Sequence, residues 1–225
     1  MAAVVVYILR HGETQENRAG VMQGHLDTEL NAAGIEQAQL TAEALEKVSF
    51  VAAHSSDLSR AIKTAEIILK KHPGVELQKH EALRERYMGD MQGVRISEWE
   101  GPMPANMEPA ADFSARADQW WKESVQSYVS SVTSRRGGTT SQGPAHVLVV
   151  SHGGLIRVLL QGLIGSRHVR CAEGVDVGRY RCSNASVTVI EVDESGKGTL
   201  LLFADTAHLD VELVEGNVDV VDEGK

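Results

Sequence analysis

Two histidines in this chain each follow a run of apolar residues that has the pattern of a buried strand. Arg10 and His11 come directly after the apolar run 4–9. His152 follows the apolar run 147–150 by one serine, and an apolar helical pattern comes after it. A neutral imidazole nitrogen can attack phosphorus, and the planar fork of a guanidinium can hold two phosphate oxygens. The repeated arrangement therefore indicates chemistry on a phosphoryl group.

Charged residues also follow two other predicted strands. Arg60 lies in the first turn of the helix after the predicted strand 50–53, and Glu85 follows the predicted strand 75–78. The carboxyl ends of parallel strands meet at one edge of a sheet, and the ligands of such sheets bind there. We therefore expect one rim of the sheet to hold the side chains of Arg10, His11, Arg60, Glu85 and His152.

These residue types suit the transfer of a phosphoryl group to water. Helix N-termini favour anions, and Arg10 and Arg60 would add positive charge for a dianionic phosphate. The same guanidiniums disfavour protonation of His11, which keeps its imidazole nucleophilic. His11 would attack in line and form a phospho-histidine, while His152 donates a hydrogen bond to a transferring oxygen. Glu85 would protonate the leaving alcohol and then activate water.

Strand and helix patterns alternate along the chain. Apolar runs predict strands at 4–9, 50–53, 75–78, 147–150, 186–192 and 199–204, the last two as a hairpin. Apolar residues at helical spacing predict helices at 32–48, 58–69, 113–132 and 155–164, the first two capped by Asn31 and Asp57. The alternation predicts an α/β fold, a three-layer sandwich with a mostly parallel central sheet and helices on both faces.

One catalytic domain is expected over residues 1–209. Within it, residues of about 86–135 are expected to form a small helical and irregular cap, inserted before the last catalytic strand. The polar, glycine-rich connection 133–144 and the acidic tail 210–225 are expected to be mobile.

Composition excludes several classes of function. The 225 residues are 42% hydrophobic and 24% charged, and the net charge of -9 argues against nucleic-acid binding. No apolar stretch has the length of a transmembrane helix, and the N-terminus lacks a signal-peptide pattern. Two cysteines give no disulfide framework, and the histidines lack zinc-binding spacing. We expect a cytoplasmic protein without metal or other cofactor that binds a small phosphorylated metabolite. The sequence leaves open whether the protein forms a homodimer.

Four segments, 10–24, 55–65, 83–93 and 150–154, carry these residues in a fixed order. Together they resemble the motifs of the histidine phosphatase superfamily, the phosphoglycerate mutase-like proteins, over nearly the whole chain to about His208.

The resemblance implies a role for each matching residue. His11 would be the phosphorylated nucleophile and Glu85 the acid and base. The phosphate pocket would be formed by Arg10, Arg60 and His152. Substrate and phosphate contacts would come from Asn17, Gln23, Gly24 and Gly153.

The match favours the phosphatase branch of the superfamily. The interval between Glu85 and His152 is shorter than in cofactor-dependent mutases, and segment 23–27 looks more like the phosphatases. Segment 83–93 resembles broad-specificity and fructose-2,6-bisphosphatase-like members. We therefore expect metal-independent hydrolysis of small phosphomonoesters, sugar phosphates among them. Fructose-2,6-bisphosphatase or phosphoglycerate mutase activity remains the alternative.

Charge in the expected cap favours a monoester over a bisphosphate. Between residues 86 and 132 the chain has four basic and seven acidic side chains. A bisphosphorylated sugar would need a second cationic pocket there, and the cap as a whole does not supply one. Arg84 or Arg86 could still supply charge locally.

Two hypotheses from other classes compete with this interpretation. A serine hydrolase could use Ser151 with Asp205 and His208, but Arg10, His11 and Arg60 would then have no role. A phosphoryl-binding scaffold on the same fold would need neither His11 nor Glu85. Ordinary ion pairs are the structural alternatives for two site residues, Arg60 with Asp57 and Glu85 with Arg84 or Arg86. We interpret His208 as structural.

Overall fold

The computed structural model describes residues 1–136, 143–178 and 181–209. The predicted mobile tail 210–225, and residues 137–142 of the predicted mobile connection, lie outside the described residues.

The described strands form one mixed sheet. They are β1 (Ala2–Arg10), β2 (Phe50–Ser56), β3 (Leu77–His80), β4 (Ala145–Ser151), β5 (Val169–Cys171), β6 (Val187–Asp193) and β7 (Gly198–Asp205). Their order across the sheet is β3-β2-β4-β1-β6-β7-β5. The first four are mutually parallel, β6 is antiparallel to both β1 and β7, and β5 is parallel to β7. The predicted parallel sheet and the predicted hairpin of the last two strands are confirmed.

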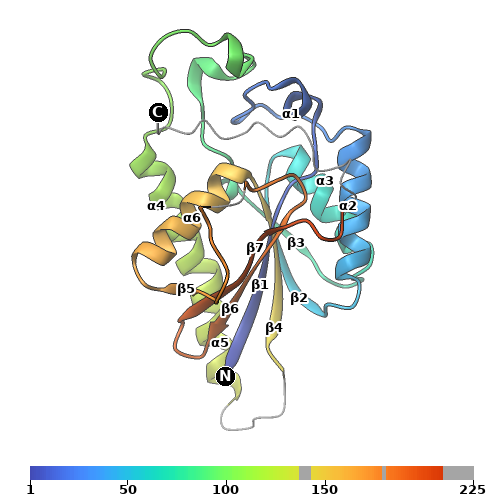
Figure 1. Ribbon diagram of the computed structural model, residues 1–225. Helices are drawn as coiled ribbons and strands as arrows, with labels where there is room; N and C mark the ends of the chain where they lie inside the picture. Colours follow the sequence, from blue (N-terminus) through green and yellow to red (C-terminus); the bar gives the residue numbers. More distant parts are fainter. Residues whose placement is uncertain (137–142, 179–180, 210–225) are drawn as a thin grey trace.

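Helices cover both faces of this sheet (Figure 1). They are α1 (Gln15–Ala19), α2 (Ala32–Leu45), α3 (Ser59–Leu69), α4 (Ala110–Trp120), α5 (Ser127–Arg136) and α6 (Gly153–Gly165). A π-helical turn, η4 (Trp121–Gln126), joins α4 to α5. Single 3-10 turns are η1 (Glu81–Leu83), η2 (Gly89–Met91) and η3 (Ile96–Glu98).

Alternate side chains of β1 enter two separate apolar cores, because successive residues of a strand face opposite sides of the sheet. Val4 and Val6 lie in the larger core, whose helical side chains come from α4, η4, α5 and α6. Val5 and Leu9 lie in the second core, which includes residues of α2 and α3. The predicted three-layer sandwich is confirmed, and β1 at its centre is held rigidly from both sides.

The long helix through residues 110–136 belongs to the layer that covers the sheet. Phe113, Trp120, Trp121 and Val125 are buried in the larger core together with β1 and β4. Of the segment assigned to the cap, only residues 86–109 rise above the carboxyl ends of β1 and β4 (Figure 1). This segment has a separate small core of its own, in which Met88 and Met91 pack with Met22.

The start of α3 differs from the prediction. Asn31 caps α2 as expected, since its side chain accepts a hydrogen bond from the amide of Gly34. Asp57, however, does not cap α3. The N-cap residue is Leu58, without a side-chain cap, and the Asp57 carboxylate instead accepts from Arg84 at 2.7 Å. Both carboxylate oxygens of Asp57 are engaged by the guanidinium of Arg84, and this bidentate ion pair orients Asp57 away from the start of α3.

Two strand boundaries also differ from the predictions. β2 continues past Ala53 to Ser56, and β3 runs from Leu77 to His80 instead of 75–78. The strand ends are polar and therefore give no apolar signal. They pair nonetheless, with Ser56 beside His80, at the edge where the site residues gather.

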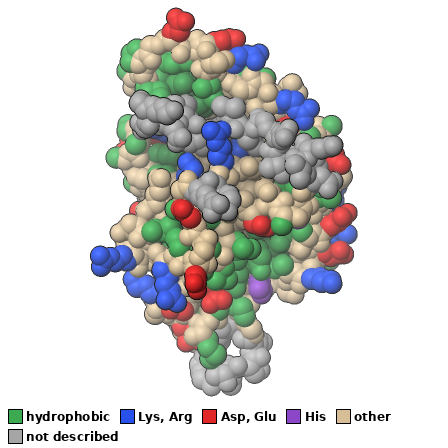
Figure 2. Space-filling view, viewed as in Figure 1, with side chains coloured by type: hydrophobic (Ala, Val, Ile, Leu, Met, Phe, Trp, Pro, Cys, Tyr) green, Lys and Arg blue, Asp and Glu red, His purple; other side chains and the backbone are tan. Residues whose placement is uncertain are grey.

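Surface charge is mixed on the face seen in Figure 2. Basic side chains stand there in small separate groups, interspersed with acidic ones, and hydrophobic side chains gather over the strands. Among the described residues, no helix combines the length and the apolar character that crossing a bilayer requires.

Candidate active site

The five predicted site side chains meet at the carboxyl edge of the sheet. Arg10 ends β1, His11 follows it, His152 follows β4, Arg60 lies in the first turn of α3, and Glu85 follows η1. The first four side chains belong to residues at most 2% exposed, and Glu85 is 7% exposed. The rings of His11 and His152 lie 5.1 Å apart. The sequence therefore predicted correctly that these residues share one rim.

His11 is fixed in one tautomer by the backbone. Its Nδ1 lies 2.8 Å from the carbonyl oxygen of Gly12, which can only accept, so Nδ1 carries the proton and donates. Nε2 therefore keeps a lone pair, and the Nε–H of Arg60 donates to it at 3.3 Å. Burial, then the charges of Arg60 and Arg10, lower the pKa of His11 well below its usual value. The ring is neutral and nucleophilic at Nε2.

Two glycines allow the chain beside His11 to approach α2. A Cβ on Gly12 would lie 2.4 Å from the carbonyl oxygen of Gly34, and a Cβ on Gly34 would lie 2.1 Å from that of Glu13. The amide of Gly12 also donates to the hydroxyl of Thr64 at 3.0 Å. The segment that carries His11 is thus packed backbone against backbone and anchored to α3.

Arg60 joins the site to the loop that follows α1. Its two terminal nitrogens donate to the carbonyl oxygens of Leu26 at 2.7 Å and Gly24 at 2.9 Å. Gly24 has a φ of 51°, which is costly for residues with a side chain. Arg10 is held from the other side, because its Nη1 donates to the carbonyl oxygen of Cys182 at 2.7 Å. Two buried guanidiniums therefore flank His11.

His152 is held through its other ring nitrogen. Its Nε2 lies 2.8 Å from the hydroxyl oxygen of Ser56 at the end of β2. Its Nδ1 is buried without a hydrogen-bond partner among the described residues. Burial, then the charges of Arg60, His11 and Arg10, lower the pKa of His152 well below its usual value. The second imidazole is also neutral, with Nδ1 in a polar, cationic environment.

Glu85 is held by backbone amides. Its two carboxylate oxygens accept from the amides of Arg86 and Gly154, each at 2.8 Å. Arg84 pairs with Asp57 rather than with Glu85. The Asp57 carboxylate is thus bound to Arg84, and the suggested pairing of Arg60 with Asp57 is not what the structure shows. A Cβ on Gly154 would lie 2.4 Å from Oε1 of Glu85, so this glycine makes room for the carboxylate.

The four residues implied as substrate contacts lie around this centre. Asn17 is buried and closes a capping box with Thr14 at the start of α1. Gln23 accepts through Oε1 from Thr14 at 3.0 Å, and its side-chain nitrogen is buried without a partner among the described residues. Gly153 begins α6, where a Cβ would lie 3.5 Å from Cδ of Arg10. Gly24 binds Arg60, as described above.

Sequence reasoning missed several residues that hold the site. Ser56 and Gly154 lie inside recognised motifs but were given no role. Asn184 donates to the carbonyl oxygen of His11 at 2.9 Å from a loop with no strand or helix pattern. Arg116 donates to backbone oxygens near Glu85 from an otherwise apolar helix face. A single arginine between apolar positions was the only signal for Arg116.

The serine hydrolase hypothesis is wrong. The Ser151 hydroxyl is fully buried and donates to the carbonyl oxygen of Leu83 at 2.8 Å. His208 lies instead beside Thr41, with its Nε2 3.0 Å from the threonine hydroxyl oxygen, as a structural residue would. Within the described part of the chain, no three histidine, cysteine or acidic side chains gather as metal ligands.

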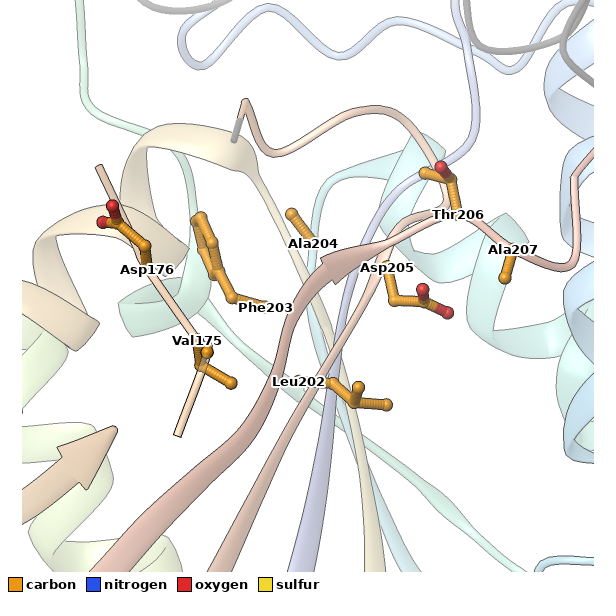
Figure 3. Close-up of a pocket in the computed structure, with 9 residues that line it drawn as sticks. Val175, Asp176, Leu202, Phe203, Ala204, Asp205, Thr206 and Ala207 are labelled. Atoms are coloured by element: carbon orange, nitrogen blue, oxygen red, sulfur yellow. The ribbon is translucent and has the colours of Figure 1, made fainter. Parts of the chain in front are cut away.

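A separate cavity of about 410 Å³ lies near the end of β7 (Figure 3). Asp176, Phe203 and Asp205 are among its lining residues. None of the nine described residues that line it is basic. Two carboxylates without a cation disfavour a phosphate ester, so this cavity does not compete with the rim as the substrate site.

Comparison with known proteins places the chain among phosphatases. The sequence profile of the histidine phosphatase superfamily (branch 1) matches residues 6–206. Phosphoglycerate mutase-like protein 4 of Arabidopsis thaliana is 36% identical over 91% of this chain and 86% of its own length. A broad-specificity phosphatase of Saccharomyces cerevisiae is 31% identical over 91% of this chain and 86% of its own. The native structure of mycobacterial glucosyl-3-phosphoglycerate phosphatase superimposes with a TM-score of 0.70 at 28% identity, covering 90% of this chain and 99% of that one.

Proposed function

Since the chain belongs to branch 1 of the histidine phosphatase superfamily and is a phosphoric monoester hydrolase, we propose that His11 is its nucleophile. The observation that supports this role is a neutral, buried imidazole with its Nδ1 proton bound to the Gly12 carbonyl and a lone pair on Nε2. Nε2 attacks phosphorus in line with the leaving oxygen. The phosphorus–nitrogen bond forms as the phosphorus–oxygen bond of the ester breaks.

The phosphate pocket is assigned to Arg10, Arg60 and His152. The two guanidiniums stabilise the charge on the equatorial oxygens of the transferring group. With the Ser56 hydroxyl donating to Nε2 of His152, the ring proton resides on Nδ1, which is the buried nitrogen without a described partner. Nδ1–H then donates to a phosphoryl oxygen. Positive charge and hydrogen bonds thus come from the protein alone.

Glu85 is assigned the proton transfers. It donates a proton to the departing alcohol oxygen in the first step. In the second step it takes a proton from the water that attacks the phospho-histidine, so His11 is released and phosphate leaves. Its carboxylate is oriented for this by the amides of Arg86 and Gly154.

Substrate contacts are assigned to Gln23, Asn17, Gly24 and Gly153. Gln23 has the strongest support, because its side-chain nitrogen is buried at the site without a partner among the described residues. Gly153 offers a backbone N–H at the start of the 13-residue helix α6, where the helix dipole favours an anion.

Small phosphomonoesters are the proposed substrates, with sugar phosphates among them. Two of the cations near Glu85 are bound to acids: Arg84 to Asp57, and Arg116 to Glu108. A second phosphate group would have to displace these carboxylates. Curated relatives include a metal-independent phosphoserine phosphatase of Arabidopsis thaliana, so phosphoserine belongs in the substrate panel beside sugar phosphates. A strong preference for fructose 2,6-bisphosphate over every monoester would contradict the proposal.

Phosphoglycerate mutase activity is the second candidate, because a phosphoglycerate mutase of Schizosaccharomyces pombe is 30% identical over 77% of this chain. The two activities differ in what accepts the phosphoryl group from His11. Hydrolysis gives inorganic phosphate at the rate of substrate loss. A mutase gives an isomeric ester instead, and phosphorus NMR of 3-phosphoglycerate incubations distinguishes the two.

Trapping of the intermediate tests the nucleophile. Rapid acid-free quenching with ³²P-labelled substrate should label the protein with an acid-labile, base-stable phosphoryl group at His11. His11→Ala should lose the label and turnover and keep its far-ultraviolet circular dichroism. Undiminished labelling of His11→Ala would refute the assignment, and a phosphoryl-binding scaffold would incorporate no label.

Metal independence is a second expected outcome. Activity in excess EDTA should equal activity without it, because the nucleophile and the stabilising charges are protein groups. Loss of activity with chelator, followed by recovery with a divalent cation, would contradict this.

A cytoplasmic location is proposed from the two free thiols, of which Cys171 is exposed. Cell fractionation checks it, and recovery in a secreted fraction would count against it. The homodimer left open by the sequence is tested by light scattering of the purified protein.

A further inference from the structure

The turn that carries Glu85 is held mainly by side chains. Residues 82–85, here called the acid turn, comprise the last two residues of η1 and the two that follow, and they lead into the excursion 86–109. All four consecutive backbone carbonyls of this turn accept a hydrogen bond from a side chain. Ser151 binds the Leu83 oxygen, and Arg116 of α4 binds those of Ala82, Arg84 and Glu85. The conformation of the turn therefore depends on these donors.

Arg116 uses its whole guanidinium in this arrangement. Nη1 donates to the oxygens of Ala82 and Arg84, each at 2.8 Å, and Nη2 donates to that of Glu85 at 2.8 Å. The remaining N–H groups bind the Glu108 carboxylate, at 2.7 Å from Nε and 3.0 Å from Nη2. A guanidinium has five N–H groups, so all five are engaged. The ring of Phe113, one turn earlier in α4, lies 4.7 Å from the guanidinium carbon.

Glu108 connects Arg116 to both ends of the excursion. Its carboxylate also accepts from the amide of Tyr87 at 3.1 Å, and its own amide donates to the carbonyl oxygen of Tyr87 at 2.8 Å. Nε of Arg86 donates to the carbonyl oxygen of Glu108 at 2.8 Å. Burial would raise the pKa of Glu108, but the hydrogen bonds and charge of Arg116 lower it overall, so the carboxylate stays ionised. The base of the excursion is thus clamped beside the acid turn.

We propose that Arg116, paired with Glu108, is a positioning residue for Glu85 that sets where the acid stands relative to the leaving oxygen. The inference rests on the proposed role of Glu85 as acid and base. Arg116 itself touches neither the phosphoryl group nor His11. It acts through three carbonyls of the acid turn, so its loss should impair proton donation and leave nucleophilic attack intact.

The leaving group separates these two effects. A p-nitrophenolate leaves without a proton, whereas an alkoxide needs one, so loss of the acid should slow alkyl esters selectively. The readout is kcat/KM for the best alkyl phosphate of the panel divided by kcat/KM for p-nitrophenyl phosphate. Glu85→Gln provides the reference, with an expected drop in this ratio of about 100-fold.

Arg116→Ala should lower the same ratio by about 10-fold or more, while labelling of His11 by p-nitrophenyl phosphate stays within about 3-fold of the parent. Arg116→Lys should recover part of the ratio, because lysine keeps the charge but has three donors in place of five.

A second variant tests the same pair if Arg116→Ala does not fold. Glu108→Gln should lower the ratio by about 3-fold, a smaller drop than that of Arg116→Ala. Arg95→Ala is the matched control, an exposed arginine in an ion pair with Glu98, and should not change the ratio.

Two results overturn the proposal. The first is an equal loss of kcat/KM for both substrates in folded Arg116→Ala and Glu108→Gln, while Glu85→Gln still slows the alkyl ester selectively. Arg116 would then have only a structural role, and the proposed function would stay intact. A Glu85→Gln protein without leaving-group selectivity removes Glu85 as the acid, and the positioning role of Arg116 is then overturned with it.

Discussion

The two histidines of the site are held in opposite orientations by different partners. His11 binds a backbone carbonyl through Nδ1, which leaves the lone pair on Nε2. His152 faces the Ser56 hydroxyl through Nε2, which leaves Nδ1 toward the site. Burial, together with the nearby charges of Arg60 and Arg10, lowers the pKa of both rings and keeps them neutral, so the positive charge at the site comes from the two guanidiniums. This difference in orientation supports the proposed roles of His11 as nucleophile and His152 as hydrogen-bond donor.

Adding a methyl group at Gly154 should damage the acid specifically. A Cβ there would lie 2.4 Å from Oε1 of Glu85, so Gly154→Ala must displace the carboxylate. Because the displaced atoms end a flexible side chain, unfolding free energy should change by less than about 1 kcal/mol, while alkyl-phosphate hydrolysis falls about 10-fold to 100-fold. Steady-state kinetics and denaturant unfolding of the same samples measure both effects.

A glycine at the other end of the same helix supplies the control. Nothing lies within 4 Å of a Cβ on Gly165, which ends α6. Gly165→Ala should therefore stay within about 3-fold of the parent activity. If both variants lost activity equally, displacement of Glu85 would not be the cause.

At the residue scale, the sequence predicted which side chains meet but not what each one binds. Arg10, His11, Arg60 and His152 follow strands or start helices, and parallel strand ends must share an edge, so their convergence follows from pattern. Asp57 pairs with Arg84 across elements, and no local pattern encodes that choice. Arg116 reaches the acid turn from α4, a contact that depends on how α4 packs.

At the element scale, the close approach of the His11 segment to α2 helps to fix the position of His11. A Cβ on Gly12 would lie 2.4 Å from the carbonyl oxygen of Gly34. A Cβ on Gly34 would lie 2.1 Å from the carbonyl oxygen of Glu13. This packing requires glycine at both positions, because the backbone atoms that a Cβ would meet cannot move aside.

Gly34→Ala should therefore destabilise the fold. Its Cβ would lie 2.1 Å from the carbonyl oxygen of Glu13, so the backbone beside His11 must shift. We expect a loss of about 1–3 kcal/mol in unfolding free energy and a parallel loss of activity. Gly165→Ala is the control, because nothing lies within 4 Å of its Cβ and it ends α6. Alanine there should be neutral or stabilise by up to about 1 kcal/mol. Equal stability of the two variants would contradict the packing argument.

Elements with strong periodicity were predicted well, and those defined by polar residues were not. The helical spacing of apolar residues 113–132 predicted a continuous helix and concealed its π-helical turn, which shifts the register by one residue within an unbroken apolar stripe. Its assignment to the cap came from sequence position alone. Burial of Trp120 and Trp121 against the sheet is a tertiary property that position does not reveal.

At the scale of the whole molecule, net charge and local charge have opposite signs. The chain carries a net charge of -9, yet two buried arginines flank His11. The desolvation cost of such groups must be offset by fixed partners, which here include the carbonyls of Cys182, Leu26 and Gly24. Composition gives the net negative charge, and the fold shows how the two arginines are kept inside the protein.

Buried neutral histidines make the whole domain sensitive to acid. Eight of the nine histidines have a pKa below the ordinary value, and burial is the largest cause for each. In the unfolded chain they take up protons near pH 6.5, whereas His11 and His152 in the folded protein do not until the pH is much lower. Below about pH 6.5 the unfolded state therefore binds more protons than the folded state. The stabilising contribution of the neutral histidines is fully present above about pH 6.5 and is lost as the pH falls below that value.

Because His11 and His152 resist protonation in the folded protein, each should lower the unfolding free energy by up to about 1.4 kcal/mol per pH unit below about pH 6.5. Urea unfolding at about pH 7.5, 6.5, 5.5 and 5.0 measures this slope. His11→Asn should reduce the slope by about one proton. Asp57 and Glu108 contribute little to a loss between about pH 6.5 and 5.0, because a carboxylate with a lowered pKa keeps its contribution until the pH falls to the ordinary carboxylate values of 3.8 and 4.5. Equal unfolding free energies at the highest and lowest pH would show that the buried imidazoles accept protons without opening the fold.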